Sequence, residues 1–151
     1  MWITLTADAV KTRLTKPELT ALLGAARQAE QTDAGLLAEA ASSVASEVRG
    51  YVSACSRNRL GPEGTIPEEL LGSSLALVRR YLFTRLPGMK SLYDEVRQKE
   101  TEDALTRLRD TAKGFFAVVA PESPAPAAEQ VSGGSPSITK KTRRFGTEDG
   151  V

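Results

Sequence analysis

The clearest pattern in the chain is an apolar residue at every third or fourth position between residues 32 and 55. This spacing places the apolar side chains on one face of an α-helix. The positions opposite the stripe are small and polar. The pattern predicts one long helix that begins near Thr32 or Asp33 and runs for roughly seven turns. Its stripe consists of Leu37, Ala41, Val44, Val48, Tyr51 and Cys55.

A second stripe with the same spacing follows a break at residues 61–64, where Gly-Pro-Glu-Gly interrupts the helical pattern. Pro67 and the acids after it are typical of a first helical turn, because proline lacks the N–H that would be unpaired there. Pro87 and Gly88 end the pattern. We therefore predict a helix from about residue 66 to residue 86. Its stripe consists of Leu71, Leu75, Val78, Leu82 and Leu86.

Two short helices are predicted ahead of the long one. Thr6 suits an N-cap, because its hydroxyl accepts a hydrogen bond from an early helical N–H, and this helix should end near Leu14. Thr15 and Glu18 then have the spacing of a capping box, with Pro17 in the first turn. The apolar face of the second helix consists of Leu19, Leu22, Leu23 and Ala26.

The last predicted helix runs from about Ser91 to Lys113 and is apolar only at its two ends. The apolar positions are Leu92, Tyr93 and Val96 at the start, and Leu105, Leu108, Ala112 and Phe115 at the end. Every residue from Arg97 to Asp103 is polar. A helix with such a middle is not buried along its whole length, so we expect this section to project or to face solvent.

The composition changes at Pro121. Half of the prolines in the chain fall within the sixteen residues that begin there, together with two adjacent glycines and several serines. Such a segment does not build a packed core. We predict a helical domain over 1–120, a flexible linker over 121–137 and a basic arm over 138–151. The predicted fold class is all-α: a small bundle of about five helices with a long central helix, plus an extended Pro/Gly/Ser-rich C-terminal arm.

The chain contains no histidine and a single cysteine, Cys55. The commonest general base and metal ligand is therefore missing, and no internal disulfide can form. The sequence also has no glycine-rich phosphate loop and no paired-ligand motif. We predict that the protein is not an enzyme, that it uses no cofactor or metal, and that Cys55 is a small core residue.

No stretch of the sequence approaches the roughly 20 apolar residues that a membrane-spanning helix needs. The N-terminus reaches Asp8 before any sustained apolar run, which is not the pattern of a secretory signal. We expect a soluble protein that is made in a cytoplasm and has no membrane partner.

Charge is balanced over the chain but uneven along it. The 20 basic and 19 acidic residues leave a formal net charge of +1. Seven basic and three acidic residues lie between Arg49 and Lys90, which is a local excess of about +4. Charges of this kind are most often solvated or ion-paired. The candidate contact residues in this segment are Arg57, Arg59, Arg79 and Arg80.

The C-terminal arm carries basic residues between two apolar ones: Ile138, Lys140, Lys141, Arg143, Arg144 and Phe145. Three interpretations are open, namely an idle solubilising tail, a nucleic-acid arm, or an extended peptide that binds a partner surface. A single aromatic residue is a weak nucleic-acid signal. A peptide anchored by two apolar residues is a known mode of recognition. We favour the third interpretation and treat these six residues as partner-interface candidates.

The order and spacing of several features resemble the phage Mu-like head-tail connector proteins, which are neck or head-completion proteins of tailed phages. The matching features are Gly50 and Tyr51 near the end of the long helix, Pro62 and Pro67 around the loop, Leu70 and Leu71 at the restart, and Arg80 with Tyr81. The resemblance covers roughly residues 1–116. Residues 57–62, Arg-Asn-Arg-Leu-Gly-Pro, depart from the Arg-Tyr-x-Leu-Pro-like stretch that is usual in the family, so the contacts of this loop are not carried over.

The resemblance implies a structural virion protein without an active site. Many copies would form an oligomeric, dodecameric ring in the virion neck, between the portal protein and the tail or a tail-terminator or stopper protein, after assembly in the host cytoplasm. Packaged DNA would pass through with transient, non-specific contacts. Arg57, Arg59, Arg79 and Arg80 would then be channel-facing or inter-subunit residues.

Two other interpretations stay open. A small DNA-binding or regulatory helical protein would use the basic segment 49–90 and the arm, and its affinity would fall steeply as salt rises. A scaffold or chaperone-like factor would leave after assembly and be missing from mature particles.

Overall fold

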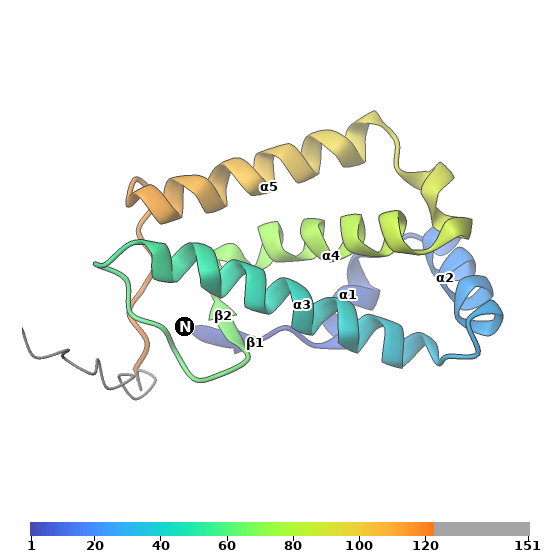
Figure 1. Cartoon of the computed structure of the whole chain (residues 1–151), viewed down its shortest axis with the longest axis horizontal. Helices are drawn as coiled ribbons and strands as arrows, with labels where there is room; N and C mark the ends of the chain where they lie inside the picture. Colours follow the sequence, from blue (N-terminus) through green and yellow to red (C-terminus); the bar gives the residue numbers. More distant parts are fainter. Residues whose placement is uncertain (123–151) are drawn as a thin grey trace, which may run out of the picture.

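The computed structural model describes residues 1–122, so the predicted arm and most of the predicted linker lie outside the described residues. The described part of the chain folds into a helical bundle with one small sheet (Figure 1). In chain order the elements are β1 (Trp2–Thr4), α1 (Ala7–Arg13), α2 (Lys16–Gln28), α3 (Asp33–Ala54), β2 (Thr65–Pro67), the 3-10 helix η1 (Glu68–Leu70), α4 (Leu71–Arg85), the 3-10 helix η2 (Pro87–Leu92) and α5 (Glu95–Lys113). The predicted class, a helical bundle with a long central helix, is confirmed.

Helices α3, α4 and α5 pack against one another, and within this group each runs antiparallel to the one before it in the chain. In the view of Figure 1, α4 lies between the other two. Helix α2 lies across one end of this group, where it contacts η2. The N-terminus, the loop between α3 and β2, and the chain that leaves α5 lie at the opposite end. The molecule therefore has two distinct ends, and distant parts of the sequence meet at each.

The helix starts follow the predicted capping residues. Thr6 Oγ1 accepts a hydrogen bond from the Ala9 N–H at 3.2 Å, and Thr32 Oγ1 accepts one from the Gly35 N–H at 3.1 Å. The capping box at the start of α2 is also present. These signals are local in sequence, which is why they locate α1, α2 and α3 well.

Helix α3 is buried on more than the one predicted stripe. A second row of its side chains, formed by Leu36, Ala40, Ala45 and Val52, is buried as well. The reason is that α3 contacts α4 and α5 and also α1, α2 and β2. The largest fully buried side chains around it include Phe83 and Leu82 of α4, Met89 of η2 and Leu108 of α5.

A two-stranded antiparallel sheet adds to the predicted helices. Strand β1 pairs with β2 in the register Trp2–Pro67, Ile3–Ile66 and Thr4–Thr65. The predicted helix start near residue 66 is therefore wrong, because α4 begins at Leu71 after η1. Pro67 suits either position, since proline is tolerated both in a first helical turn and at the margin of a small sheet.

The prediction for the last helix needs two corrections. Helix α5 begins at Glu95 and not at Ser91, because the Asp94 carboxylate caps it by accepting a hydrogen bond from the Arg97 N–H at 2.9 Å. Its polar middle does not face solvent throughout: Thr101 is only 4% exposed where α5 lies along α4. Of its predicted apolar positions, Val96 and Phe115 are exposed, and so is Leu23 on the predicted apolar face of the second helix.

Candidate functional site

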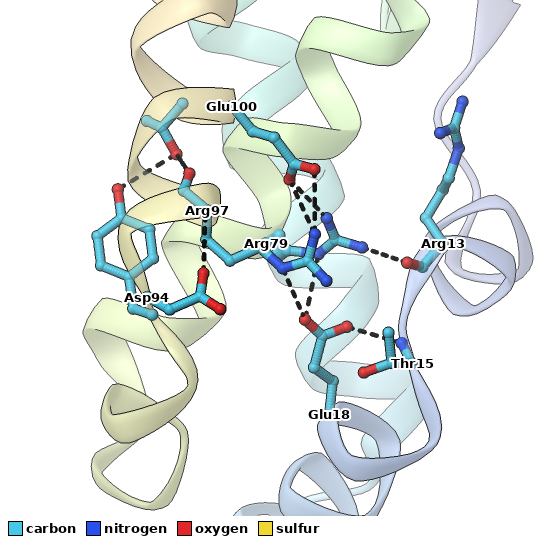
Figure 2. Close-up of polar contacts among 9 residues, drawn as sticks. Arg13, Thr15, Glu18, Arg79, Asp94, Arg97 and Glu100 are labelled. Atoms are coloured by element: carbon cyan, nitrogen blue, oxygen red, sulfur yellow. Dashed lines mark hydrogen bonds and ion pairs between the residues drawn. The ribbon is translucent and has the colours of Figure 1, made fainter.

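Four charged side chains from three helices form an ion-pair cluster, which we call the Arg79 cluster (Figure 2). Its members are Glu18 of α2, Arg79 of α4, and Arg97 and Glu100 of α5. Arg79 Nη1 lies 2.9 Å from Glu100 Oε2, and Arg79 Nε lies 3.6 Å from Glu18 Oε1. Arg97 Nε lies 3.3 Å from Glu18 Oε1, and Arg97 Nη1 lies 3.0 Å from Glu100 Oε1. Each guanidinium therefore bridges both carboxylates.

The inner half of the cluster is buried and its charges are matched. The side chain of Glu18 is 4% exposed and that of Arg79 is 12% exposed, whereas those of Arg97 and Glu100 are 21% and 41% exposed. A buried charge is strongly unfavourable unless an opposite charge and hydrogen bonds compensate it. Two arginines and two glutamates supply that balance here. The relative positions of α2, α4 and α5 therefore depend on four side chains that must be present together.

The cluster also holds the turn between α1 and α2. Glu18 Oε2 accepts a hydrogen bond from the Thr15 N–H at 2.7 Å, which is half of the predicted capping box. Arg79 donates from Nη2 to the carbonyl oxygen of Arg13, the last residue of α1 (Figure 2). The sequence identified Glu18 as a capping residue. It gave no sign that the same carboxylate pairs with two arginines from other helices.

A groove of about 480 Å³ lies beside the cluster. Arg79 and Glu100 line it together with Arg13, Asp103 and Arg107. Because both positive and negative side chains line this groove, it suits a protein surface with both signs better than a run of phosphates.

The four predicted arginines separate into two groups. Arg79 is engaged by acceptors of its own chain, as described above. Arg57, Arg59 and Arg80 are exposed. Arg80 lines a shallow depression with Glu47 and Tyr81. The prediction that these residues face a channel or a neighbouring subunit stays a prediction for the three exposed arginines.

Arg57 lies close to the end of α5. Its Nη2 donates to the Gly114 carbonyl oxygen at 3.2 Å. A hydrogen bond from the Arg57 backbone N–H, opposed in part by burial, lowers the pKa of the Cys55 thiol below its ordinary value. Cys55 is itself buried, as predicted for a small core residue.

Two further arginines make contacts that the sequence did not indicate. Arg49 of α3 donates to the carbonyl oxygens of Pro62 and Thr65, each at 2.8 Å, and of Gly61 at 3.2 Å. Arg85 of α4 lies 2.5 Å from Glu39, and the hydrogen bonds to Glu39 and Tyr81 raise the Arg85 pKa above its ordinary value. The signal available for Arg49 was the glycine- and proline-rich loop, whose carbonyl groups have few local partners.

The remaining predicted residues are not placed. Ile138, Lys140, Lys141, Arg143, Arg144 and Phe145 lie outside the described residues. Within residues 1–122, acidic and cysteine side chains form no group that could hold a metal ion. No helix in this part of the chain is long and apolar enough to span a membrane.

Comparison with known proteins gives one match. A family model described as "Bacteriophage Mu, Gp36" matches residues 5–135, which span the helical bundle and most of the predicted linker. No curated protein and no solved structure matches the chain.

Proposed function

Because the chain belongs to the bacteriophage Mu Gp36 family and is therefore a phage protein, we propose that it is a structural protein of the virion neck. In this proposal it is a head-tail connector: an oligomeric ring between portal and tail through which DNA passes. The observation that carries the proposal is the extent of the match, which includes the helical bundle and most of the linker that leads to the basic arm. The protein acts by assembly and catalyses no reaction.

The arrangement of charge supports an assembly role. Arg79, Arg97 and the two glutamates are paired with one another where α2, α4 and α5 meet, so they act within the subunit itself. Arg57, Arg59 and Arg80 stay exposed and are the candidates for contacts with a neighbouring copy or with DNA. Contacts with DNA in a channel are weak and independent of sequence, since phosphate attraction carries no base information.

The arm supplies the second set of contacts in this proposal. Ile138 and Phe145 anchor it in a partner, the portal protein or a tail component, and the four basic residues between them add charge. Ordering such a segment costs conformational entropy, which is offset only when the partner is present. The ring, which we propose to be dodecameric, and the partners would therefore form together.

To test the proposal, the tagged full-length chain is expressed together with its neighbouring genes. The complexes that co-purify with it are then examined by electron microscopy. Rings attached to a portal support it. A monomer that binds neither itself nor a portal overturns it. The full-length variant Ile138→Ser/Phe145→Ser should form fewer portal complexes, whereas Thr139→Ser, a conservative change within the arm, should not.

Exposed arginines favour one alternative, a small DNA-binding or regulatory protein. Arg57, Arg59 and Arg80 would then contact phosphates, and three such contacts would lower the affinity for duplex DNA about 40-fold between 50 and 200 mM salt. A protein interface with an apolar centre shows a much weaker dependence on salt. A salt titration of both DNA binding and self-association therefore separates the two functions.

A further inference from the structure

Three distant segments of the chain meet where it leaves α5. They are β1, η1 and the residues after Gly114, and they lie at the end of the bundle opposite α2 (Figure 1). Trp2 Nε1 donates a hydrogen bond to the Val119 carbonyl oxygen at 2.9 Å. Glu69 Oε1 accepts one from the Val119 N–H at 3.2 Å. We call this pair of side chains, Trp2 and Glu69, the Val119 clamp.

The clamp binds backbone and not side chain. The Val119 side chain is 57% exposed, so burial contributes little to its position. Both polar groups of its peptide backbone are instead paired, as they would be beside a neighbouring strand. The contact therefore fixes where the chain runs without requiring a particular residue at 119.

Trp2 packs against the loop between α3 and β2. A Cβ atom at Gly61 would lie 2.6 Å from Trp2 Cδ2, so the glycine lets the loop backbone approach the indole closely. The Arg49 guanidinium lies 6.0 Å from the centroid of the ring and also holds the loop through the Gly61 carbonyl oxygen. These contacts connect the clamp to α3, the central helix.

The Val119 N–H is the hydrogen-bond donor to the Glu69 side chain within residues 1–122. The Oε2 atom of Glu69 is buried and makes no hydrogen bond with any residue in 1–122. A buried acceptor without a partner costs roughly 1–3 kcal/mol. The hydrogen bond from the Val119 N–H to Glu69 Oε1 offsets part of this cost.

We propose that Trp2 and Glu69 are positioning residues for the C-terminal arm. They fix the point from which residues 123–151 leave the bundle, next to the α3–β2 loop and on the same end of the molecule as Arg57. The importance of this position for portal binding rests on the proposed connector function; the clamp itself does not.

Distance measurement between two spin labels tests the clamp in the full-length protein. The labels are placed at Ser53→Cys on α3 and at Glu122→Cys, with Cys55→Ala as background. We expect one narrow distance distribution. Glu69→Ala should broaden it at least twofold, whereas Glu68→Ala, which removes an exposed acid next to it, should leave it unchanged. Equal widths in all three proteins overturn the proposal.

Portal binding then separates positioning from general stability. In the intact arm, Trp2→Phe or Glu69→Ala should weaken portal capture at least threefold. In the full-length Ile138→Ser/Phe145→Ser variant, adding Glu69→Ala should cause no further loss, because a misplaced arm matters only if the arm binds. A further loss of the same size overturns the positioning role. A wild-type chain that never binds a portal overturns the proposed function, and the spin-label distances still decide the clamp.

Discussion

The Arg79 cluster and the Val119 clamp both join distant segments with polar side chains, but their chemistry differs. The cluster uses four charged groups at the contact between three helices, of which Glu18 and Arg79 are buried. The clamp uses one indole N–H and one carboxylate oxygen, and it holds a backbone whose side chain is exposed. Removing one member of the cluster leaves its charges unbalanced beside the buried Glu18. Removing one member of the clamp breaks a single hydrogen bond to the backbone of an exposed residue.

The difference separates two tasks. The cluster holds α2, α4 and α5 together, because separating these helices would break the ion pairs between them. The clamp fixes the position of the segment that follows α5. We therefore expect mutations in the cluster to act on global stability, and mutations in the clamp to act on local order.

Arg79→Ala should have the largest effect. It leaves two carboxylates, one of them the buried Glu18, with Arg97 as their cationic partner in the cluster. A hydrogen bond to a charged group contributes about 1.5–3 kcal/mol, so we expect a loss near the upper end of this range. Urea unfolding of the variant measures the loss. Arg80→Ala, an exposed neighbour on the same helix, should stay within about 0.5 kcal/mol of the wild type. Similar losses for the two variants would contradict the distinction between cluster and surface.

Gly114→Ala should have the second-largest effect on stability. Gly114 is the C-cap of α5, directly before the segment that the clamp holds. Gly114 has φ +78°, a left-handed conformation that costs an alanine about 1–2 kcal/mol. The added Cβ would also collide with the Arg57 guanidinium. Thermal unfolding measures the loss. Gly50→Ala is the matched control, because its Cβ meets no atom within 4 Å, and alanine should stabilise this helical position by up to about 1 kcal/mol.

Trp2→Phe should cost about 1 kcal/mol, the net value of a single hydrogen bond. Its larger effect is local. The Val119 amide should lose protection in hydrogen exchange, while amides in α3 and α4 keep theirs. Tyr51→Phe, which removes a hydroxyl that bonds to nothing within residues 1–122, should change neither. Loss of protection across α4 would mean that the clamp is part of the global structure.

Asp33→Asn should have the smallest effect and shows what an exposed ion pair contributes by comparison. Lys11 Nζ lies 3.2 Å from Asp33 Oδ2, and this hydrogen bond lowers the pKa of the carboxyl. A lowered folded-state pKa means that the stabilisation is present above the unfolded pKa, near 4, and is lost as the pH falls through the folded value. The small difference in Tm between wild type and variant should therefore shrink between pH 7 and pH 2. A constant difference would assign the effect to another cause.

Sequence patterns were sufficient wherever the determinant is local. Thr6, Thr15 and Thr32 precede their helices directly, and the caps form as predicted. Strand β2 was missed because three residues carry no measurable alternation, and its partner β1 lies far from it in the sequence, near residue 1. Proline and acids there have the same pattern as a helix start.

The cluster was missed for a related reason. The charged side chains of Arg97 and Glu100 predict exposure to solvent only if no opposite charge faces them from another helix. The sequence does not show which face of α5 meets Arg79. Glu18 was recognised from spacing to Thr15 alone. The candidate arginines were chosen by charge, which does not distinguish Arg79 with its internal partners from Arg80 beside it.

The contact between Trp2 and Val119 has a consequence for synthesis. Trp2 leaves the ribosome well before Val119, which lies 117 positions later in the sequence. Strand β1 can pair with β2 in the meantime, but the indole N–H lacks this acceptor until Val119 emerges. A contact between residues so far apart also requires the closure of a large loop. Closure of this end of the molecule therefore waits until α5 has been made.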